Sequence, residues 1–242
     1  YKRLQRKGYL RRDVQRLVNL NRHAFAACMV AAGEADGMVT GLTRSTSDCL
    51  ADVQMAIDPA SAQPAFGLTL LLGLRGKTIF IADSLVNFRP NDEELADIVV
   101  GAARAARHLG HEPRVALLSH STFGDPPNER IAPMRDAVAI LDRRGADFEY
   151  DGEMSPDVAL SPSIRSLYPF CRLTGDANVL VMPGLHSAHV VARLLHHLGG
   201  GTTIGPLLIG MEKPAQILPM DASVSQIVDV ACIAAYQSIP RG

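Results

Sequence analysis

The chain has 242 residues, of which 47% are hydrophobic and 20% charged, and its formal net charge is -1. This composition excludes a disordered or collagen-like chain, and the length suffices for one large domain or two medium ones. Because the net charge is close to zero, no overall field attracts a polyanion, which argues against a dedicated nucleic-acid-binding protein.

The apolar stretches of the sequence are too short for a membrane span. The longest, such as Phe66 to Leu74, fall well short of the roughly twenty residues that a bilayer requires. We also expect no signal peptide. The cysteines form no C-x-x-C pair and favour a reducing compartment. We therefore expect a cytoplasmic protein with no membrane partner. Since the first residue is Tyr1, we also expect a piece of a longer polypeptide.

The amino-terminal part of the chain opens with a predicted helix. Apolar residues recur at three- and four-residue spacing over 11–33, which predicts one helix there. A short strand over 37–40, a polar loop, a second helix, and strands over 68–74 and 78–82 are expected next. The clearest helix covers 91–109, because Asn91 and Glu94 have the spacing of a capping box.

The remaining chain alternates strands and helices. We expect strands over 114–118, 148–150 and 178–182, and helices over 128–144, 187–198 and 223–236. This alternation predicts an α/β fold with parallel sheets and right-handed crossovers. Ligands of such folds bind beyond the carboxyl ends of the strands. The polar loops after Ala82, Leu118, Tyr150 and Met182 therefore form the candidate site.

Two further patterns have simple structural explanations. The glycines over 199–205 follow a helix and lack the Lys-Ser/Thr ending of a phosphate loop, which favours helix termination. His186, His189 and His196 could share one helix face. No acid or cysteine lies at a matching spacing, so we expect no metal here.

Two polar motifs leave more room for function. Asp151 and Glu153 are either an acid/base pair at a strand end or a solvated turn, and the sequence leaves both open. His120 and Ser121 are adjacent, so on extended backbone they point to opposite sides and do not readily form a catalytic dyad. A ligand-binding turn, in which Gly124 permits close backbone approach, is the better interpretation.

Several sequence blocks, in this order, resemble the phosphate acetyl/butyryltransferase family. Residues 80–96 (FIADSLVNFRPNDEELA) resemble its aspartate-and-asparagine segment, and residues 115–124 its second-domain strand and turn. Residues 151–154 (DGEM), 175–185 and 199–210 are similar to further family blocks. Within the family, the Ser-His-Ser-x-Phe-Gly turn looks most like that of the transferase-like domain at the carboxyl end of large bacterial NADP-dependent malic enzymes.

The resemblance implies an architecture. It predicts two α/β domains with a cleft between them, related to the isocitrate and isopropylmalate dehydrogenases, with the first strand unit of the family missing. By position, residues 1–110 and 211–242 would form the first domain, and 111–210 an inserted second one. It also implies a homodimer or higher oligomer formed largely through the inserted domain, with the apolar stripe of the helix 187–198 as a candidate contact: Val190, Val191, Leu194 and Leu195.

The departures from the family pattern concern its transfer chemistry. The resemblance implies a serine, an arginine and an aspartate where this chain has Pro219, Met220 and Gln226, and a further arginine where it has Ala51. An amide cannot accept a proton at neutral pH, and neither proline nor methionine carries a charge for a developing anion. We therefore expect the domain to lack transferase activity, with a live phosphate acetyltransferase as the alternative.

The resemblance and the loop positions together predict a site that binds a ligand but does not catalyse a reaction. We expect acetyl-CoA as an allosteric effector, no cofactor in this domain, and NADP with a divalent metal only in the malic enzyme domain of the same chain. The ligand-binding candidates are Asp83, Asn87, Ser121, Thr122, Gly124, Asp151, Glu153, His189 and Gly205.

Overall fold

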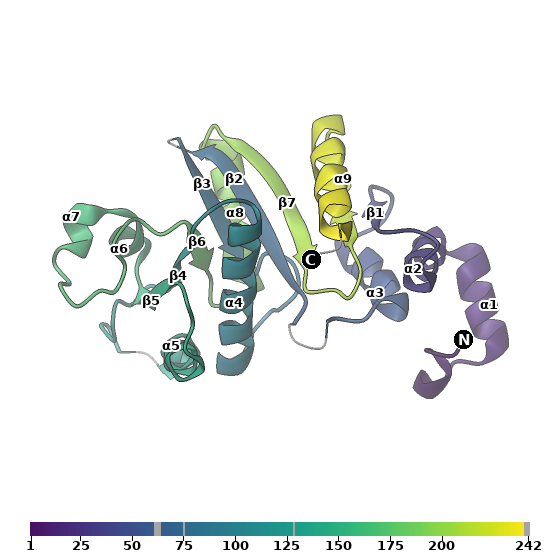
Figure 1. The fold of residues 1–242 in the computed structure, drawn as a ribbon, viewed down its shortest axis with the longest axis horizontal. Coiled ribbons are helices and arrows are strands. Elements are labelled where there is room, and N and C mark those ends of the chain that lie inside the picture. The colour runs from purple at the N-terminus through teal and green to yellow at the C-terminus, as the bar shows by residue number, and fades with distance from the viewer. Residues whose placement is uncertain (61–63, 75, 128, 240–242) are drawn as a thin grey trace. The chain divides into compact units, whose positions relative to one another are not determined.

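The computed structural model describes residues 1–60, 64–74, 76–127 and 129–239. The chain folds into two compact units: Tyr1–Ala65 with Gly210–Gly242 form unit 1, and Phe66–Ile209 form unit 2 (Figure 1). The second boundary lies within one residue of the expected one. The first lies at residue 65 and not near 110, because the two strands over 66–82 belong to the sheet of unit 2.

Unit 1 is built on a two-stranded parallel sheet. Gly41 of its first strand lies opposite Leu218 of its second, so the loops that follow both strands leave from the same end of the pair. Helices from both halves of the unit pack against these strands and against one another. The elements are α1 (Arg11–Leu20), α2 (Arg22–Ala32), β1 (Met38–Gly41), α3 (Thr46–Ala56), β8 (Ala215–Leu218) and α9 (Val224–Ser238), after a short 3-10 helix η1 (Gln5–Lys7).

The prediction of a single helix over 11–33 is wrong, because α1 ends and α2 begins on either side of Asn21. The backbone of Asn21 is extended, and its side chain accepts hydrogen bonds from the amides of His23 and Ala24. Asparagine is among the preferred helix N-caps for this reason. The apolar spacing continues through Asn21, so periodicity alone does not reveal the break.

Unit 2 contains a six-stranded sheet in the order β5-β4-β6-β3-β2-β7. Four neighbouring strands are parallel, as predicted, but β2 runs antiparallel to both β3 and β7, so the sheet is mixed. β7 was not expected as a strand. The strands are β2 (Phe66–Leu74), β3 (Lys77–Ala82), β4 (Arg114–Leu118), β5 (Glu149–Met154), β6 (Val179–Val181) and β7 (Thr202–Ile209).

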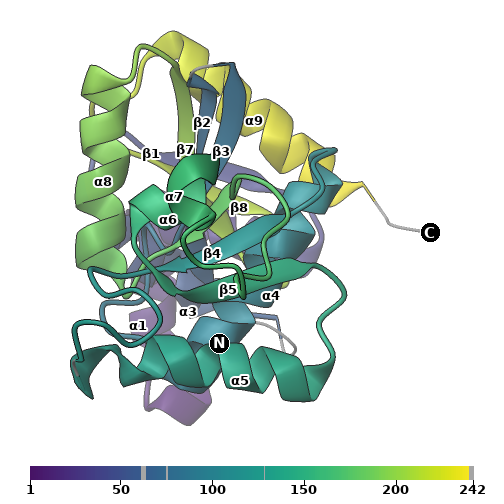
Figure 2. The same ribbon diagram turned by 90° about the vertical axis from the view of Figure 1, so that its left-hand side faces the viewer.

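Helices cover both faces of this sheet (Figures 1 and 2). One core cluster joins Ile79 and Ile81 of β3 to Ala188 and Ala192 of α8 and to Val158 of α6. Because strand residues alternate between faces, the neighbouring residues of β3 face the α4 side, where α5 packs along α4 and β5. The helices are α4 (Asp92–His108), α5 (Ala132–Arg144), α6 (Pro156–Leu160), α7 (Pro162–Arg165) and α8 (Leu185–Leu198), with a 3-10 helix η2 (Glu129–Ile131) before α5.

Several local predictions are confirmed. Asn91 and Glu94 exchange the two hydrogen bonds of a capping box at the start of α4, each at 2.9 Å. α8 ends at Leu198, and Gly199, the first residue of the glycine cluster, is its C-cap. The helix expected over 128–144 is seen as η2 and α5, and its first position, Asn128, lies outside the described residues. Within those ranges, no helix is long and apolar enough to cross a membrane.

Asp176 anchors an ionic network before β6. Its carboxylate pairs with Lys77 and, at 3.3 Å, with Nη2 of Arg165. The hydrogen bond from Lys77 is the main cause that lowers the pKa of Asp176, against the opposing effect of burial. The native state therefore stabilises the ionised carboxylate of Asp176 relative to the unfolded chain. This stabilisation is complete above about pH 4 and is lost as the pH falls further, through the lowered pKa.

We expect Asp176→Asn to lower the free energy of unfolding by about 1 kcal/mol at pH 7, because the partner Lys77 is largely solvated. The difference from the unmodified chain should shrink at pH 3, as urea titrations at both pH values would show. Asp136→Asn is the matched control, since Asp136 is exposed on α5 and takes part in no ion pair within the described ranges. A difference that stays constant between the two pH values contradicts this assignment.

Candidate functional site

The loop after β3 is organised around a buried carboxylate. Asp83 is 1% exposed. Its Oδ1 accepts hydrogen bonds from the amides of Gly67, Leu85 and Val86 at 2.7, 2.8 and 3.1 Å. Its Oδ2 accepts from both the backbone and the side-chain nitrogen of Asn87, each at 2.6 Å. These donors occupy both oxygens, so the structure gives Asp83 the role of holding its own loop.

Close backbone packing surrounds this loop. A Cβ on Gly67 would lie 2.5 Å from the Leu85 nitrogen, and one on Gly184 would lie 2.3 Å from the Phe88 oxygen. The amide of Leu185 donates to the Asn87 carbonyl at 2.9 Å. The loops after β3 and β6 are therefore joined, with Asn87 at the junction.

A second buried carboxylate, Glu153, supports the turn after β4. Its Oε1 accepts from Ser121 Oγ at 3.0 Å and from the Gly124 amide at 2.8 Å, and its carbonyl accepts from the Phe123 amide. Ser121 and Glu153 are each 1% exposed. The structure thus brings together three of the predicted residues from two separate segments: Ser121, Gly124 and Glu153.

Half of the Glu153 carboxylate is not hydrogen-bonded within the described ranges. Its Oε2 is buried without such a partner, and Nε of Arg135 lies 3.6 Å from it. Buried carboxylates normally have their oxygens satisfied. Arg135, which is itself about half exposed, is thus the cation nearest to this oxygen among the ion pairs of the described residues.

Asp151 and Glu153 do not form a solvated turn, and among the described residues no hydrogen-bond donor contacts both carboxylates. β5 continues to Met154, so both residues lie within the strand, and both are buried. Asp151 accepts instead from the amides of Gly152 and Arg172, at 2.9 and 2.8 Å. Each carboxylate thus ties a different segment to β5. Thr122 adds to the turn, because its Oγ1 accepts from the Ser155 amide at 3.1 Å.

Asp151 holds the backbone of Arg172, and the Arg172 side chain fixes the same segment further. Its guanidinium pairs with Asp142 at 2.6 Å and lies 5.9 Å from the centre of the Tyr150 ring. Burial, aided by the hydrogen bond to Asp142, raises the pKa of Tyr150 to about 12. The phenol is therefore neutral at physiological pH and remains a hydrogen-bond donor to Asp142, at 2.6 Å.

An aromatic cluster beside the turn was not anticipated from the sequence. The ring of Phe123 lies 4.9 Å from that of Phe170 and 5.6 Å from that of Tyr168, measured between centroids. Phe170 is 65% exposed. Phe170 lies two residues before Arg172, whose amide donates a hydrogen bond to Asp151. It is far from Phe123 in the sequence, so only the tertiary structure brings the two rings together. The cluster offers an apolar surface next to the polar turn.

Two further predicted residues belong neither to this turn nor to the loop after β3. His189 is exposed on α8 and makes no hydrogen bond to the turn among the described residues. Gly205 lies within β7 with φ +107°, where a Cβ would be 2.8 Å from the Leu68 oxygen. Its glycine is therefore explained by strand packing against β2.

The positions that depart from the transferase pattern lie in unit 1. Pro219 and Met220 follow β8 directly, and the Met220 side chain is 66% exposed. Gln226 completes a capping box at the start of α9, where its Oε1 accepts from the Ser223 amide at 2.9 Å. Ala51 is exposed on α3. None of these side chains supplies a base or a cation, and the amide of Gln226 has a structural role.

We searched the part of the chain that the structure describes for side chains that could bind a metal ion. There, no three or more His, Cys, Asp or Glu side chains come together in a way that would hold an ion. The four cysteines are free thiols.

Comparison with known proteins gives a consistent family. Residues 1–235 match the family described as phosphate acetyl/butaryl transferase. The chain is 56% identical to the NADP-dependent malic enzyme of Rhizobium meliloti over 98% of its own length, but it spans only 31% of that enzyme. It is 38% identical to the phosphate acetyltransferase of Paracoccus denitrificans, with 88% of this chain and 70% of that protein covered.

The solved structures agree in fold. The EutD phosphotransacetylase from Staphylococcus aureus superposes with a TM-score of 0.84 at 27% identity, covering 98% of this chain and 73% of that one. The mixed α/β fold with parallel strands is thus that of the phosphotransacetylases. The chain spans about a third of the length of the malic enzymes that it matches. It belongs to the phosphate acetyl/butyryltransferase family.

Proposed function

We propose that this chain is a regulatory domain of an NADP-dependent malic enzyme, which binds acetyl-CoA without transferring its acetyl group. The malic enzyme part, which oxidatively decarboxylates malate to pyruvate, would lie in the same polypeptide and would hold the NADP and the divalent metal. Identity to malic enzymes over nearly the whole chain supports this origin. The free thiols are consistent with a cytoplasmic location.

The residues that stand at the transfer positions are the observation that carries the proposal. Transfer of an acetyl group from CoA to phosphate, or the reverse, needs a base for the thiol and cations for the anionic oxygens. The family resemblance implies these groups at positions where the chain has Gln226, Pro219 and Met220. The Gln226 amide accepts no proton and caps α9. Losing the base alone reduces a rate by about 10²–10⁴.

Retained binding is supported by the turn in unit 2. Ser121, Thr122 and Gly124 keep a defined shape because Glu153 and Ser155 hold them. The aromatic rings of Phe123 and Phe170 add an apolar surface to this polar turn. A domain that binds a metabolite without converting it can shift the equilibrium between two states of an attached enzyme. We therefore assign acetyl-CoA an allosteric role.

The alternative function is a live phosphate acetyltransferase, which the similarity to proteins of that name favours. A coupled assay for acetyl phosphate formation from acetyl-CoA and phosphate separates the two. The Paracoccus denitrificans enzyme serves as the positive control. We expect turnover per chain at least about 10²-fold below that control. Turnover comparable to the control would establish the alternative and overturn the proposal.

We further propose that the domain pairs with a second copy through α8. Val191 and Leu195 pack partly against the core, whereas Val190, Leu194 and Leu198 are 45%, 53% and 81% exposed. The predicted stripe therefore divides into a core side and an exposed side, and the exposed side is the candidate contact. Exposed apolar stripes of this kind are typical of interaction surfaces.

We expect light scattering to give at least twice the 26.0 kDa of one chain, and Leu194→Glu to shift the population toward the monomer. Ala139→Glu, on the exposed side of α5, is the matched control and should leave the mass unchanged. A monomer at micromolar concentration, or a Leu194→Glu variant with an unchanged mass, would refute pairing through α8.

A further inference from the structure

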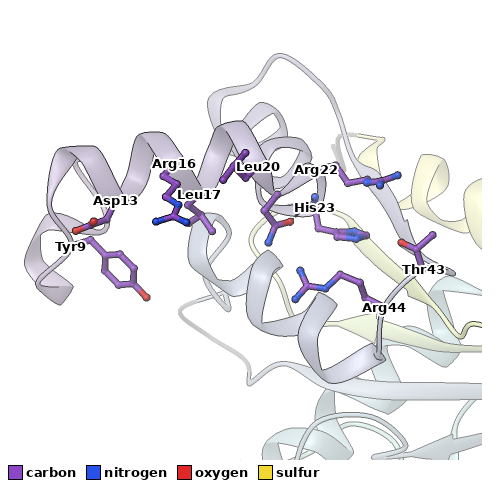
Figure 3. A pocket seen from close by; sticks show the side chains of 10 residues that line it. Tyr9, Asp13, Arg16, Leu17, Leu20, Arg22, His23, Thr43 and Arg44 are labelled. Atoms are coloured by element: carbon purple, nitrogen blue, oxygen red, sulfur yellow. Dashed lines mark hydrogen bonds between the residues drawn. The ribbon is translucent and has the colours of Figure 1, made fainter.

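Unit 1 contains a basic pocket lined by none of the residues to which the proposed function assigns acetyl-CoA. It has a volume of about 570 Å³, within the usual range for small-molecule sites. Figure 3 shows Arg16 of α1 and Arg44 of the loop before α3 on facing sides of this pocket, with the rings of Tyr9 and His23 toward its two ends in this view. Arg22, at the start of α2, is the third guanidinium of its lining.

The charges in this pocket are not balanced by its own lining. The single carboxylate there, Asp13, accepts a hydrogen bond from the Leu10 amide and lies 3.8 Å from Arg12. Arg16 and Arg22 take part in no ion pair within the described ranges. Arg44 is fixed through one nitrogen, Nη1, which donates to the buried Asp52 at 2.7 Å. Its remaining donors have no partner in that part of the chain.

His23 supplies a polar group that faces this pocket from a buried position. The side chain is 5% exposed, and its Nδ1 is hydrogen-bonded to Thr40 Oγ1. Its Nε2 has no hydrogen-bond partner among the described residues, although the residue lines the pocket. The contact with Thr40 fixes the ring, so Nε2 is held in place for a ligand atom.

These groups fit an organic phosphate. Guanidinium groups bind phosphate oxygens through two parallel hydrogen bonds, and several can share one dianion. The pocket is much larger than a phosphate ion, and Tyr9, Leu17 and Leu20 give it an apolar wall. Aromatic and aliphatic side chains of this kind pack against a nucleobase. We propose that this pocket binds a nucleoside phosphate, with the phosphate between Arg16 and Arg44 and the base against the apolar wall.

Such a ligand has two sources: a free nucleotide, or the nucleotide end of a coenzyme. Calorimetric titration of the 242-residue chain with ADP, 3′,5′-ADP and 2′,5′-ADP distinguishes them, because only the last two carry the phosphates of CoA and NADP. The source is the compound that binds most tightly. We expect saturable binding of at least one of the three, and weaker binding of inorganic phosphate and of succinate.

Arg16→Gln should weaken this binding by roughly tenfold to a hundredfold. Arg22→Gln should weaken it less, because Figure 3 shows the Arg22 side chain directed away from Arg16 and Arg44. Arg11→Gln removes the same charge from an exposed position on α1 that does not line the pocket, and should have little effect. The proposal is overturned if no nucleotide binds saturably, if succinate or phosphate binds as well as the nucleotides, or if all three variants bind alike. Ser121→Ala, in unit 2, tests the acetyl-CoA proposal independently and should leave nucleotide binding unchanged.

Discussion

Replacing Asp83 by alanine is expected to lower the free energy of unfolding by about 3–5 kcal/mol. This loss is larger than the one that we expect for Asp176→Asn. The variant removes the acceptor of backbone hydrogen bonds from Gly67, Leu85 and Asn87, among others, in a region that water does not reach. Buried amides without an acceptor pay their full desolvation cost. Urea or thermal unfolding measures the loss.

Asp136→Ala is the control for Asp83→Ala, because Asp136 is exposed on α5, and its effect should stay within about 0.5 kcal/mol. The result also decides what Asp83 does. If Asp83→Ala folds with normal stability and loses only acetyl-CoA binding, then its carboxylate contacts the ligand and does not hold the loop.

Replacing Glu153 by alanine is expected to weaken acetyl-CoA binding by roughly tenfold to a hundredfold, if acetyl-CoA binds at the turn as proposed. Oε1 of Glu153 is the acceptor for both Ser121 Oγ and the Gly124 amide. Without it the turn loses its shape, so ordering the turn opposes ligand binding and weakens it. Calorimetry on the folded variant measures the change, and near-ultraviolet circular dichroism verifies its fold.

Glu153→Gln is the matched variant, because its amide oxygen can still accept from Ser121 and Gly124. We expect it to keep most of the affinity of the unmodified chain. If the glutamine and alanine variants lose affinity equally, the charge of Glu153 acts on the ligand directly, and its role in shaping the turn is not what binding requires.

The sequence predicts the elements whose signals are local. The capping box of Asn91 and Glu94 is an example, because both partners lie within one turn of the chain. The break at Asn21 is missed although its residue type is a good cap, since the apolar spacing of the two helices is continuous across it. The antiparallel direction of β2 is missed although the sequence contains its signal: β2 ends at Leu74 and β3 begins at Lys77, a connection too short for a parallel crossover.

The site is predicted in part, for related reasons. Parallel pairing of β4 with β5 brings the turn at Ser121 toward Glu153, which the strand alternation allows one to expect. The hydrogen bonds depend on a register shift between Leu117 and Leu118, for which the sequence contains no signal. Asp83 was expected near a ligand because it follows a strand. That position cannot reveal that both of its oxygens are already occupied by its own loop.

Calorimetric titration of the chain with acetyl-CoA, in the presence of phosphate, tests the central claim most directly. The claim is that the domain binds this ligand and does not convert it. We predict a saturable binding isotherm, with acetyl-CoA recovered intact after the titration and a weaker isotherm for Ser121→Ala. An absence of saturable heat would contradict acetyl-CoA binding, and conversion of the titrant to CoA and acetyl phosphate would contradict the loss of transfer chemistry.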